Sequence, residues 1–165
     1  MLPIILNPAL TRIGLIGEGD ALARRLSLLV AAGVEPVRLT SKSAIEGLSV
    51  LFVAGLDAEA STAWASRART AGVLVNVEDV PELCDFHIPA IVRRGDLLLT
   101  VSTRGRSPAL ARRLREELET QFGPEWKERL EELGDLRDRL RADGLHFGEL
   151  AERVHAVIDT KGWLS

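Results

Sequence analysis

The sequence of 165 residues has little of several features that define whole classes of protein. A single cysteine, Cys84, excludes an internal disulfide and any cysteine cluster for zinc or iron–sulfur. No apolar run approaches the roughly 20 residues of a membrane span, so no membrane partner is expected. Aromatic residues make up 4% of the chain, tyrosine is absent and the net charge is −3. With so few stacking platforms and no overall positive charge, we expect no nucleic-acid partner.

What is present is the balance of a globular protein, with 46% hydrophobic and 27% charged residues. The length predicts one domain, or one domain with a small appendage. The N-terminal stretch has an apolar start but no basic region, so we interpret it as mature sequence rather than a signal peptide. The lone cysteine is consistent with a cytoplasmic location.

The first half of the chain alternates between strand and helix patterns. Strands are predicted over residues 12–16, 36–40, 48–55 and 73–77, and helices over 20–32 and 57–72. Asp57 is suited to cap the second helix, and Gly72 to end it. This alternation predicts an α/β fold, a Rossmann-like parallel sheet with crossover helices.

From residue 88 onward the pattern changes. Residues 88–102 hold two apolar strands joined by "RRGD", which predicts an antiparallel hairpin. Ser107 and Pro108 have the residue types of a helix N-cap and first position. Two further amphipathic helices are predicted over residues 124–144 and 147–163, the first with a leucine stripe.

A glycine turn, "GEGDAL", stands between the first strand and the first helix. Gly17 and Gly19 occupy the two places that allow a tight bend and a close approach to a dinucleotide pyrophosphate. Leu22 stands where a third small residue is usual, and no acid follows the second strand to receive the ribose hydroxyls. The local pattern leaves open both a nucleotide site and a strand-to-helix turn that binds nothing.

Arginine is concentrated between residues 88 and 115, with seven arginines against one acid, Asp96. Arg112, Arg113 and Arg115 can pair with glutamates one helical turn later. That pairing leaves Arg104 and Arg106, which are suited to a ligand rich in carboxylate or phosphate groups.

Two stretches of the sequence carry a resemblance to a known family. They are "GEGDALARR" and "NVEDVPELCDFHIPAIVRRGDLLLTVSTRGRSPALARRLREELE". The order of features in the second resembles the precorrin-2 dehydrogenase and sirohydrochlorin ferrochelatase family, which also forms the N-terminal module of siroheme synthases. The resemblance covers roughly residues 1 to 121, and no methyltransferase is expected after residue 165.

This resemblance implies three regions: a Rossmann-like NAD-binding domain (1–87), a hairpin and helix dimerisation region (88–122) and a small helical cap (123–165). It implies a homodimer that uses NAD to oxidise precorrin-2 to sirohydrochlorin. Insertion of Fe2+ or Co2+ into sirohydrochlorin is a further activity of some members. The alternative is a tetrapyrrole-binding chelatase or carrier that has lost NAD chemistry. A plain interaction domain is a third interpretation.

The resemblance also implies site residues. Asp79, at the end of the "NVED" strand, corresponds to the family's general base, which takes or relays a proton. Cofactor contacts are expected along the strand ends, at Gly17, Glu18, Gly19, Asp20, Ala21, Thr40, Ala54, Gly55, Asn76 and Val77. Substrate contacts are expected at His87 and on the arginine loop, at Ser102, Thr103, Arg104, Gly105, Arg106 and Ser107. No residue is assigned as a ligand of a resident metal.

The sequence departs from the family pattern at two places, one of which flanks the adenosine half of the nucleotide site. Only about seven residues, "SKSAIEG", separate the second strand from the next apolar run, where the family has an additional strand and turn. His87 replaces a residue that is more often apolar. Cys84 lies in a stretch shared by many relatives and is interpreted as structural.

Overall fold

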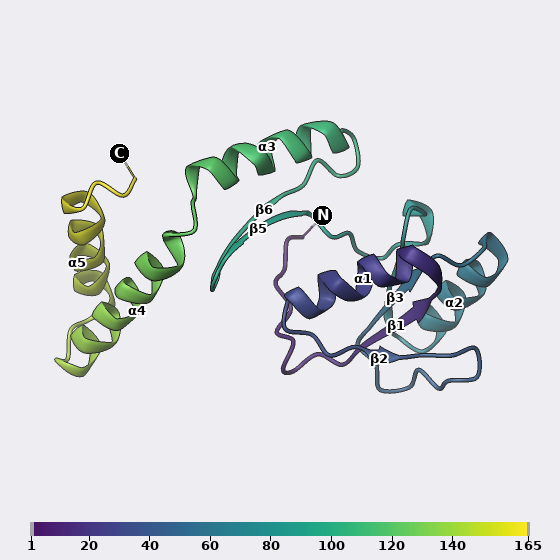
Figure 1. The fold of residues 1–165 in the computed structure, drawn as a ribbon. Helices are drawn as coiled ribbons and strands as arrows, with labels where there is room; N and C mark the ends of the chain where they lie inside the picture. Colours follow the sequence, from purple (N-terminus) through teal and green to yellow (C-terminus); the bar gives the residue numbers. More distant parts are fainter. Residues whose placement is uncertain (1, 165) are drawn as a thin grey trace. The chain divides into compact units, whose positions relative to one another are not determined.

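The computed structural model describes residues 2–164 (Figure 1). The chain divides into two compact units, with the division between Ile88 and Pro89. The division falls one residue after the border that the sequence suggests. The roles of the regions on either side stay predictions.

The first unit is a parallel four-stranded sheet with the strand order β2-β1-β3-β4. Its elements are β1 (Ile13–Gly17), α1 (Gly19–Ala31), β2 (Val37–Arg38), β3 (Val50–Ala54), α2 (Ala58–Thr70), β4 (Leu74–Val77) and the short 3-10 helix η1 (Pro81–Leu83). All strand pairs are parallel, which confirms the predicted α/β class.

Alternate residues of the strands supply two apolar layers, one beneath each helix. Leu51 and Val53 pack with Trp64 of α2, whereas Leu15 and Phe52 pack with Leu29 of α1. This division follows from the pleat of a strand, which directs successive side chains to opposite faces. All five residues of β3 are buried, as expected for a central parallel strand covered on both sides.

Strand β2 is shorter than the predicted strand 36–40. Its pairing with β1 ends when Leu39 donates its N–H to the carbonyl oxygen of Leu15 at 3.0 Å. The next N–H, of Thr40, is bonded to the side-chain oxygen of Ser43 at 2.9 Å. A turn therefore closes where the prediction continues the strand.

The second unit contains an antiparallel hairpin of β5 (Ala90–Arg94) and β6 (Leu97–Val101). Arg94 pairs with Leu97, so the turn is Gly95-Asp96. The prediction that "RRGD" forms the connection is corrected, because both arginines belong to β5. Gly95 has a φ of +57°, a conformation that glycine adopts at little cost.

Three helices follow the hairpin: α3 (Pro108–Gln121), α4 (Trp126–Ala142) and α5 (Phe147–Thr160). The Ser107 side chain accepts a hydrogen bond from the N–H of Leu110 at 3.3 Å, which confirms the predicted N-cap. Among residues 2–164, no helix combines the length and the apolar character needed to cross a membrane.

Candidate functional site

The glycine turn joins β1 to α1 through a close approach of two backbone segments. The N–H of Glu18 donates to the carbonyl oxygen of Ala54 at 3.1 Å. A Cβ atom on Gly17 would lie 1.8 Å from that oxygen, and one on Gly55 would lie 2.3 Å from the carbonyl oxygen of Glu18. Both glycines are therefore required for the ends of β1 and β3 to meet.

The N-terminus of α1 opens from this turn. Glu18 is the N-cap residue, yet its side chain makes no capping hydrogen bond. The first backbone N–H of the helix that donates to a carbonyl oxygen is that of Leu22, which bonds to Glu18. The N–H groups of Gly19, Asp20 and Ala21 therefore have no partner among the described residues. A Cβ atom on Gly19 would meet nothing within 4 Å. Open space beside free N–H groups at a helix start fits the pyrophosphate of a dinucleotide.

Asp79 lies just beyond the carboxyl end of β4, in a tight turn. The N–H of Val80 donates to the carbonyl oxygen of Val77 at 3.4 Å, and Asp79 has a φ of +61°. A left-handed backbone costs a residue other than glycine about 1 kcal/mol. Because β1, β3 and β4 are parallel, Asp79 and the glycine turn both lie at the carboxyl ends of the strands.

The loop after Asp79 is fastened to β4. Cys84 Sγ lies 3.3 Å from the N–H and 3.1 Å from the carbonyl oxygen of Val77. The Asp85 carboxylate accepts the N–H of Val75 at 3.0 Å and pairs with Arg69 at 2.9 Å. Burial raises the pKa of the Cys84 thiol, which supports the structural role assigned to this residue.

The other predicted residues of the first unit have mixed environments. Asn76 is buried, and its Nδ2 donates to the carbonyl oxygen of Phe86 at 2.9 Å. Val77 is also buried, and Ala54 is fully covered. Thr40 is exposed and shares a hydrogen bond with the hydroxyl of Ser43. His87 is exposed, whereas Cys84 on the same loop is partly buried.

Glu78 is a charged residue at the carboxyl end of β4 for which the sequence predicts no role. Its side chain is only 16% exposed, and Oε1 lies 3.8 Å from Arg24 and 3.9 Å from Arg25. The second oxygen, Oε2, is buried without a hydrogen-bond partner among the described residues. From the sequence, Glu78 would be taken for a solvated acid at a strand end. Only the packing of α1 shows that its carboxylate is largely buried beside two arginines.

In the second unit, the arginine loop is held together by its own hydroxyls. Thr103 Oγ1 donates to the carbonyl oxygen of Ser107 at 3.0 Å, and the N–H of Arg104 donates to Ser102 Oγ at 3.3 Å. Arg104 has a φ of +55°. Asp79 and Arg104 are the only non-glycine residues with positive φ among residues 2–164.

The arginines of this unit divide into two groups. Arg94 donates to the carbonyl oxygens of Phe122 at 2.8 Å and Glu119 at 3.3 Å, which fastens the hairpin to α3. The predicted pairs one helical turn apart on α3 are confirmed, at Arg112–Glu116, Arg113–Glu117 and Arg115–Glu119. Within the described chain, the side chains of Arg93, Arg104 and Arg106 have no partner, so they are available to an anion.

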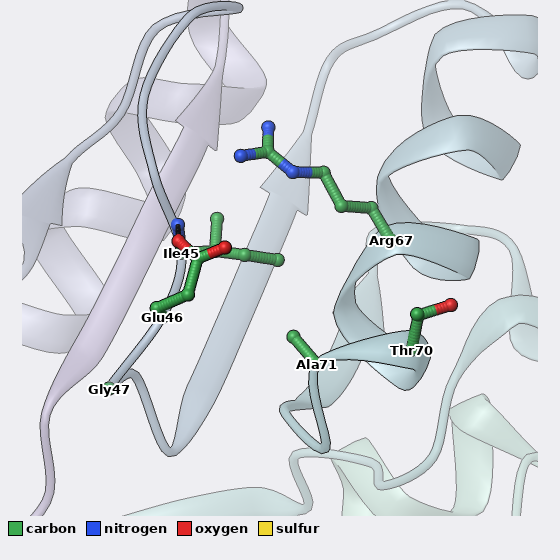
Figure 2. A pocket seen from close by; sticks show the side chains of 6 residues that line it. All are labelled: Ile45, Glu46, Gly47, Arg67, Thr70 and Ala71. Atoms are coloured by element: carbon green, nitrogen blue, oxygen red, sulfur yellow. Dashed lines mark hydrogen bonds between the residues drawn. The ribbon is translucent and has the colours of Figure 1, made fainter.

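A hollow of about 450 Å³ lies elsewhere on the first unit (Figure 2). Its lining includes Gly47, just before β3, and Ala71, just before β4. It therefore opens at the amino ends of the strands, away from the glycine turn. Within residues 2–164, no group of three or more His, Cys, Asp or Glu side chains is placed to hold a metal ion.

Comparisons with known proteins agree with this arrangement. Residues 34–90 match the family described as "Putative NAD(P)-binding", and residues 94–121 match "Sirohaem biosynthesis protein central". A siroheme synthase of Methylococcus capsulatus is 35% identical over 150 residues, which cover 77% of this chain and 32% of that protein. The chain belongs to the siroheme synthase family. A siroheme synthase of Pseudomonas aeruginosa is 41% identical over 120 residues, covering 65% of this chain and 26% of the relative.

The chain spans about a third of the length of the siroheme synthases it matches. Among solved structures, "SirC, precorrin-2 dehydrogenase" superimposes with a TM-score of 0.72 over 100% of this chain and 93% of that one. The two sequences are 19% identical, so this similarity establishes the shared fold.

Proposed function

We propose that this member of the siroheme synthase family oxidises precorrin-2 to sirohydrochlorin with a nicotinamide dinucleotide. The oxidation removes a hydride and a proton from the macrocycle, and the bound dinucleotide supplies the hydride acceptor. The free N–H groups of Gly19, Asp20 and Ala21 would hold its pyrophosphate, with Gly17 and Gly55 giving the backbone room.

The observation that carries this proposal is the backbone of Asp79. An exposed carboxylate is held in a left-handed turn beyond β4, at a position where glycine would be favoured. Strain retained in this way is typical of residues kept for chemistry. Asp79 would accept the proton that leaves the macrocycle, in the role that the sequence resemblance implies.

Arg104 shows the same strain on the loop of the second unit. A positive φ favours glycine, yet this chain has an arginine at the position. Retention of an arginine there favours a contact with the substrate, whose acetate and propionate arms are carboxylates. The side chain of Arg106, which also has no partner among the described residues, would bind a second arm. The hydroxyls of Ser102, Thr103 and Ser107 shape the loop.

The test is anaerobic turnover of freshly prepared precorrin-2, followed by absorbance, with and without dinucleotide. We expect sirohydrochlorin to form only when the dinucleotide is present. Binding of the tetrapyrrole without oxidation would contradict the dehydrogenase assignment. Ferrous or cobaltous ion would then be added to test the chelatase.

Asp79→Asn is the informative variant, because asparagine tolerates a left-handed backbone and has the same shape. We expect the oxidation rate to fall by about 10²- to 10⁴-fold while dinucleotide affinity and folding are retained. Glu82→Gln removes an exposed carboxylate from the same loop and should leave the rate unchanged. Equal rates for wild type and Asp79→Asn would refute the role of Asp79.

A second candidate function is a chelatase or carrier for sirohydrochlorin without nicotinamide chemistry. The observation that favours it is the brevity of β2, which leaves little sheet beside the adenosine half of the nucleotide site. This alternative predicts tetrapyrrole binding and no detectable dinucleotide binding. Metal ions would be substrates of such a chelatase.

We also propose that the protein is a homodimer. A cytoplasmic location is proposed with it, because it fits a role in siroheme synthesis. The support is the exposed apolar surface of α3, where Leu110 is 49% and Leu114 is 42% exposed. These residues lie one helical turn apart, so they form a continuous stripe. A second copy of the chain would cover it.

A further inference from the structure

Glu78 lies on the α1 side of β4, directly before Asp79. The pleat of a strand directs successive side chains to opposite faces. Val75 and Val77 pack in the apolar layer beneath α2, so Glu78 faces α1. Its backbone is bonded to β3, since its N–H donates to the carbonyl oxygen of Val53 at 2.9 Å. Both the backbone and the side chain of the residue before Asp79 are therefore held by neighbouring elements.

Two arginines of α1 approach the Glu78 carboxylate, but they differ in exposure. The side chain of Arg24 is 65% exposed, whereas that of Arg25 is 12% exposed. An exposed ion pair contributes little because water screens it, and a buried pair is screened much less. Arg25 is therefore the main partner of Glu78.

The position of Arg25 is fixed by aromatic side chains. Its guanidinium carbon lies 5.3 Å from the centre of the Phe52 ring, within the range of a cation–π interaction. Phe86 packs edge-on against Phe52, with ring centres 5.4 Å apart. Phe86 belongs to the loop that follows Asp79, and its carbonyl oxygen accepts a hydrogen bond from the Asn76 side chain at 2.9 Å. The segments before and after Asp79 are therefore anchored to one cluster, formed by Arg25, Phe52 and Phe86.

The ion pair of Glu78 with Arg25 is expected to contribute little net stability. The Glu78 side chain is largely buried, and Oε2 has no hydrogen-bond partner among residues 2–164. The cost of removing such a carboxylate from water offsets much of the attraction between the two charges. A buried charge that stabilises weakly is better explained by the geometry that it fixes, and the residue that follows it is the strained Asp79.

We propose that Glu78 is a positioning residue, whose ion pair with Arg25 fixes the turn of Asp79 and so sets the direction of the Asp79 carboxylate. The inference rests on the proposed role of Asp79 as the proton acceptor. The same ion pair joins α1, whose first N–H groups would hold the dinucleotide, to the end of β4. Glu78 thereby keeps the proton acceptor and the cofactor helix in one arrangement.

The first measurement is steady-state oxidation of precorrin-2 by Glu78→Gln under anaerobic conditions. Glutamine keeps the shape of the side chain and removes its charge. We expect kcat to fall at least about tenfold, because a displaced base loses its alignment with the proton that it accepts. The KM values for precorrin-2 and for the dinucleotide should stay within about twofold of wild type, since Glu78 acts through Asp79 rather than on either ligand.

Arg24 and Arg25 provide the matched comparison, because they are adjacent and differ in exposure. Arg25→Gln should lower kcat as much as Glu78→Gln does, whereas Arg24→Gln should leave it unchanged. A double variant with Glu78→Gln and Arg25→Gln should be no slower than either single variant, because both changes remove one interaction. Thermal unfolding checks that each variant is folded.

Amide hydrogen exchange of the free chain provides a readout that does not depend on turnover. The N–H of Val80 closes the turn that contains Asp79. In Glu78→Gln we expect this N–H to exchange at least about tenfold faster, because the turn opens locally. The N–H of Leu39, which is bonded to β1, should exchange at the wild-type rate. Equal acceleration at both positions would indicate a general loss of stability and would overturn the inference.

Wild-type activity is measured first, so that the two proposals can fail separately. A wild-type chain that does not oxidise precorrin-2 would overturn the inference together with the proposed function. Unchanged kcat in folded Glu78→Gln, or a double variant much slower than both single variants, would overturn the inference alone. If Glu78→Gln does not fold, Arg25→Gln tests the same pair. Loss of folding in both would assign the pair to stability and overturn the positioning role.

Discussion

The two units of this chain bury their apolar side chains to very different extents. All buried apolar residues except Val92, Trp126 and Leu150 lie in the first unit, among the residues that the structure describes. There a parallel sheet is covered on both faces by its own helices. In the second unit the leucine stripe of α4 is only half-buried, and that of α3 is exposed. A sheet between helices can complete its core alone, whereas a hairpin with loosely packed helices benefits from a second copy.

The units resemble each other in one respect. Each has one non-glycine residue with positive φ, Asp79 in the first and Arg104 in the second. In the first unit the strained residue comes shortly after β4, whose last three residues are buried. In the second it stands in a loop held by side-chain hydroxyls. Strain is thus retained in both a well-packed and a sparsely packed unit, which favours a functional rather than a packing origin.

The largest expected effect comes from placing a methyl group in the glycine turn. Gly17→Ala would bring Cβ within 1.8 Å of the Ala54 carbonyl oxygen, so the ends of β1 and β3 must separate. We expect a loss of about 3 kcal/mol or more in the free energy of unfolding, measured by urea titration. Gly134→Ala, in open space on α4, should stabilise by about 1 kcal/mol. Similar effects of the two variants would contradict the close approach.

The next effect concerns the stripe of α3. Replacing Leu110 and Leu114 together with aspartate should raise the dimer dissociation constant by about 100-fold or more, because two apolar contacts are lost. Sedimentation equilibrium measures this constant. Val30→Asp, at an exposed apolar position of the first unit, should leave it unchanged. A monomeric wild-type protein would refute the homodimer.

A smaller effect separates two adjacent arginines of β5. Arg94→Ala leaves the carbonyl oxygens of Phe122 and Glu119 without their donor, so we expect a loss of about 1–3 kcal/mol in the free energy of unfolding. Arg93→Ala, which removes an exposed arginine without a partner, should stay within about 0.5 kcal/mol of wild type. Denaturant titration of both variants provides the comparison. Equal stabilities would show that Arg94 does not fasten the hairpin to α3.

The smallest expected effect is on the rate at which the Cys84 thiol is alkylated. Because burial raises the pKa of Cys84, little thiolate forms near pH 8, and alkylation should be at least about tenfold slower than in the urea-unfolded chain. The rate should increase as pH rises toward the raised pKa. Stability follows the opposite direction, since burial favours the neutral thiol: it is full below the ordinary pKa and falls as pH rises through the raised one. Rapid alkylation of the folded protein would indicate local opening of the first unit.

Much of the fold follows directly from sequence patterns. Apolar runs, helix periodicity and the caps at Asp57 and Ser107 predict most elements of both units, and the structure agrees. The extent of β2 could not be predicted, because the choice between a longer strand and a hydroxyl-closed turn depends on the Thr40–Ser43 bonds. The position of the hairpin turn depends similarly on the pairing of Arg94 with Leu97.

The sequence alone determined the class of fold, the family and the candidacy of Asp79, because these depend on residue types at short spacings. Only the tertiary structure decided how the charged residues are used. It ties Arg94 to a helix end and places Glu78 beside Arg24 and Arg25. It leaves the side chain of Arg104 without a partner among residues 2–164. The physical reason is that a charge acts through its neighbours and its exposure. Those neighbours come from segments far apart in the chain.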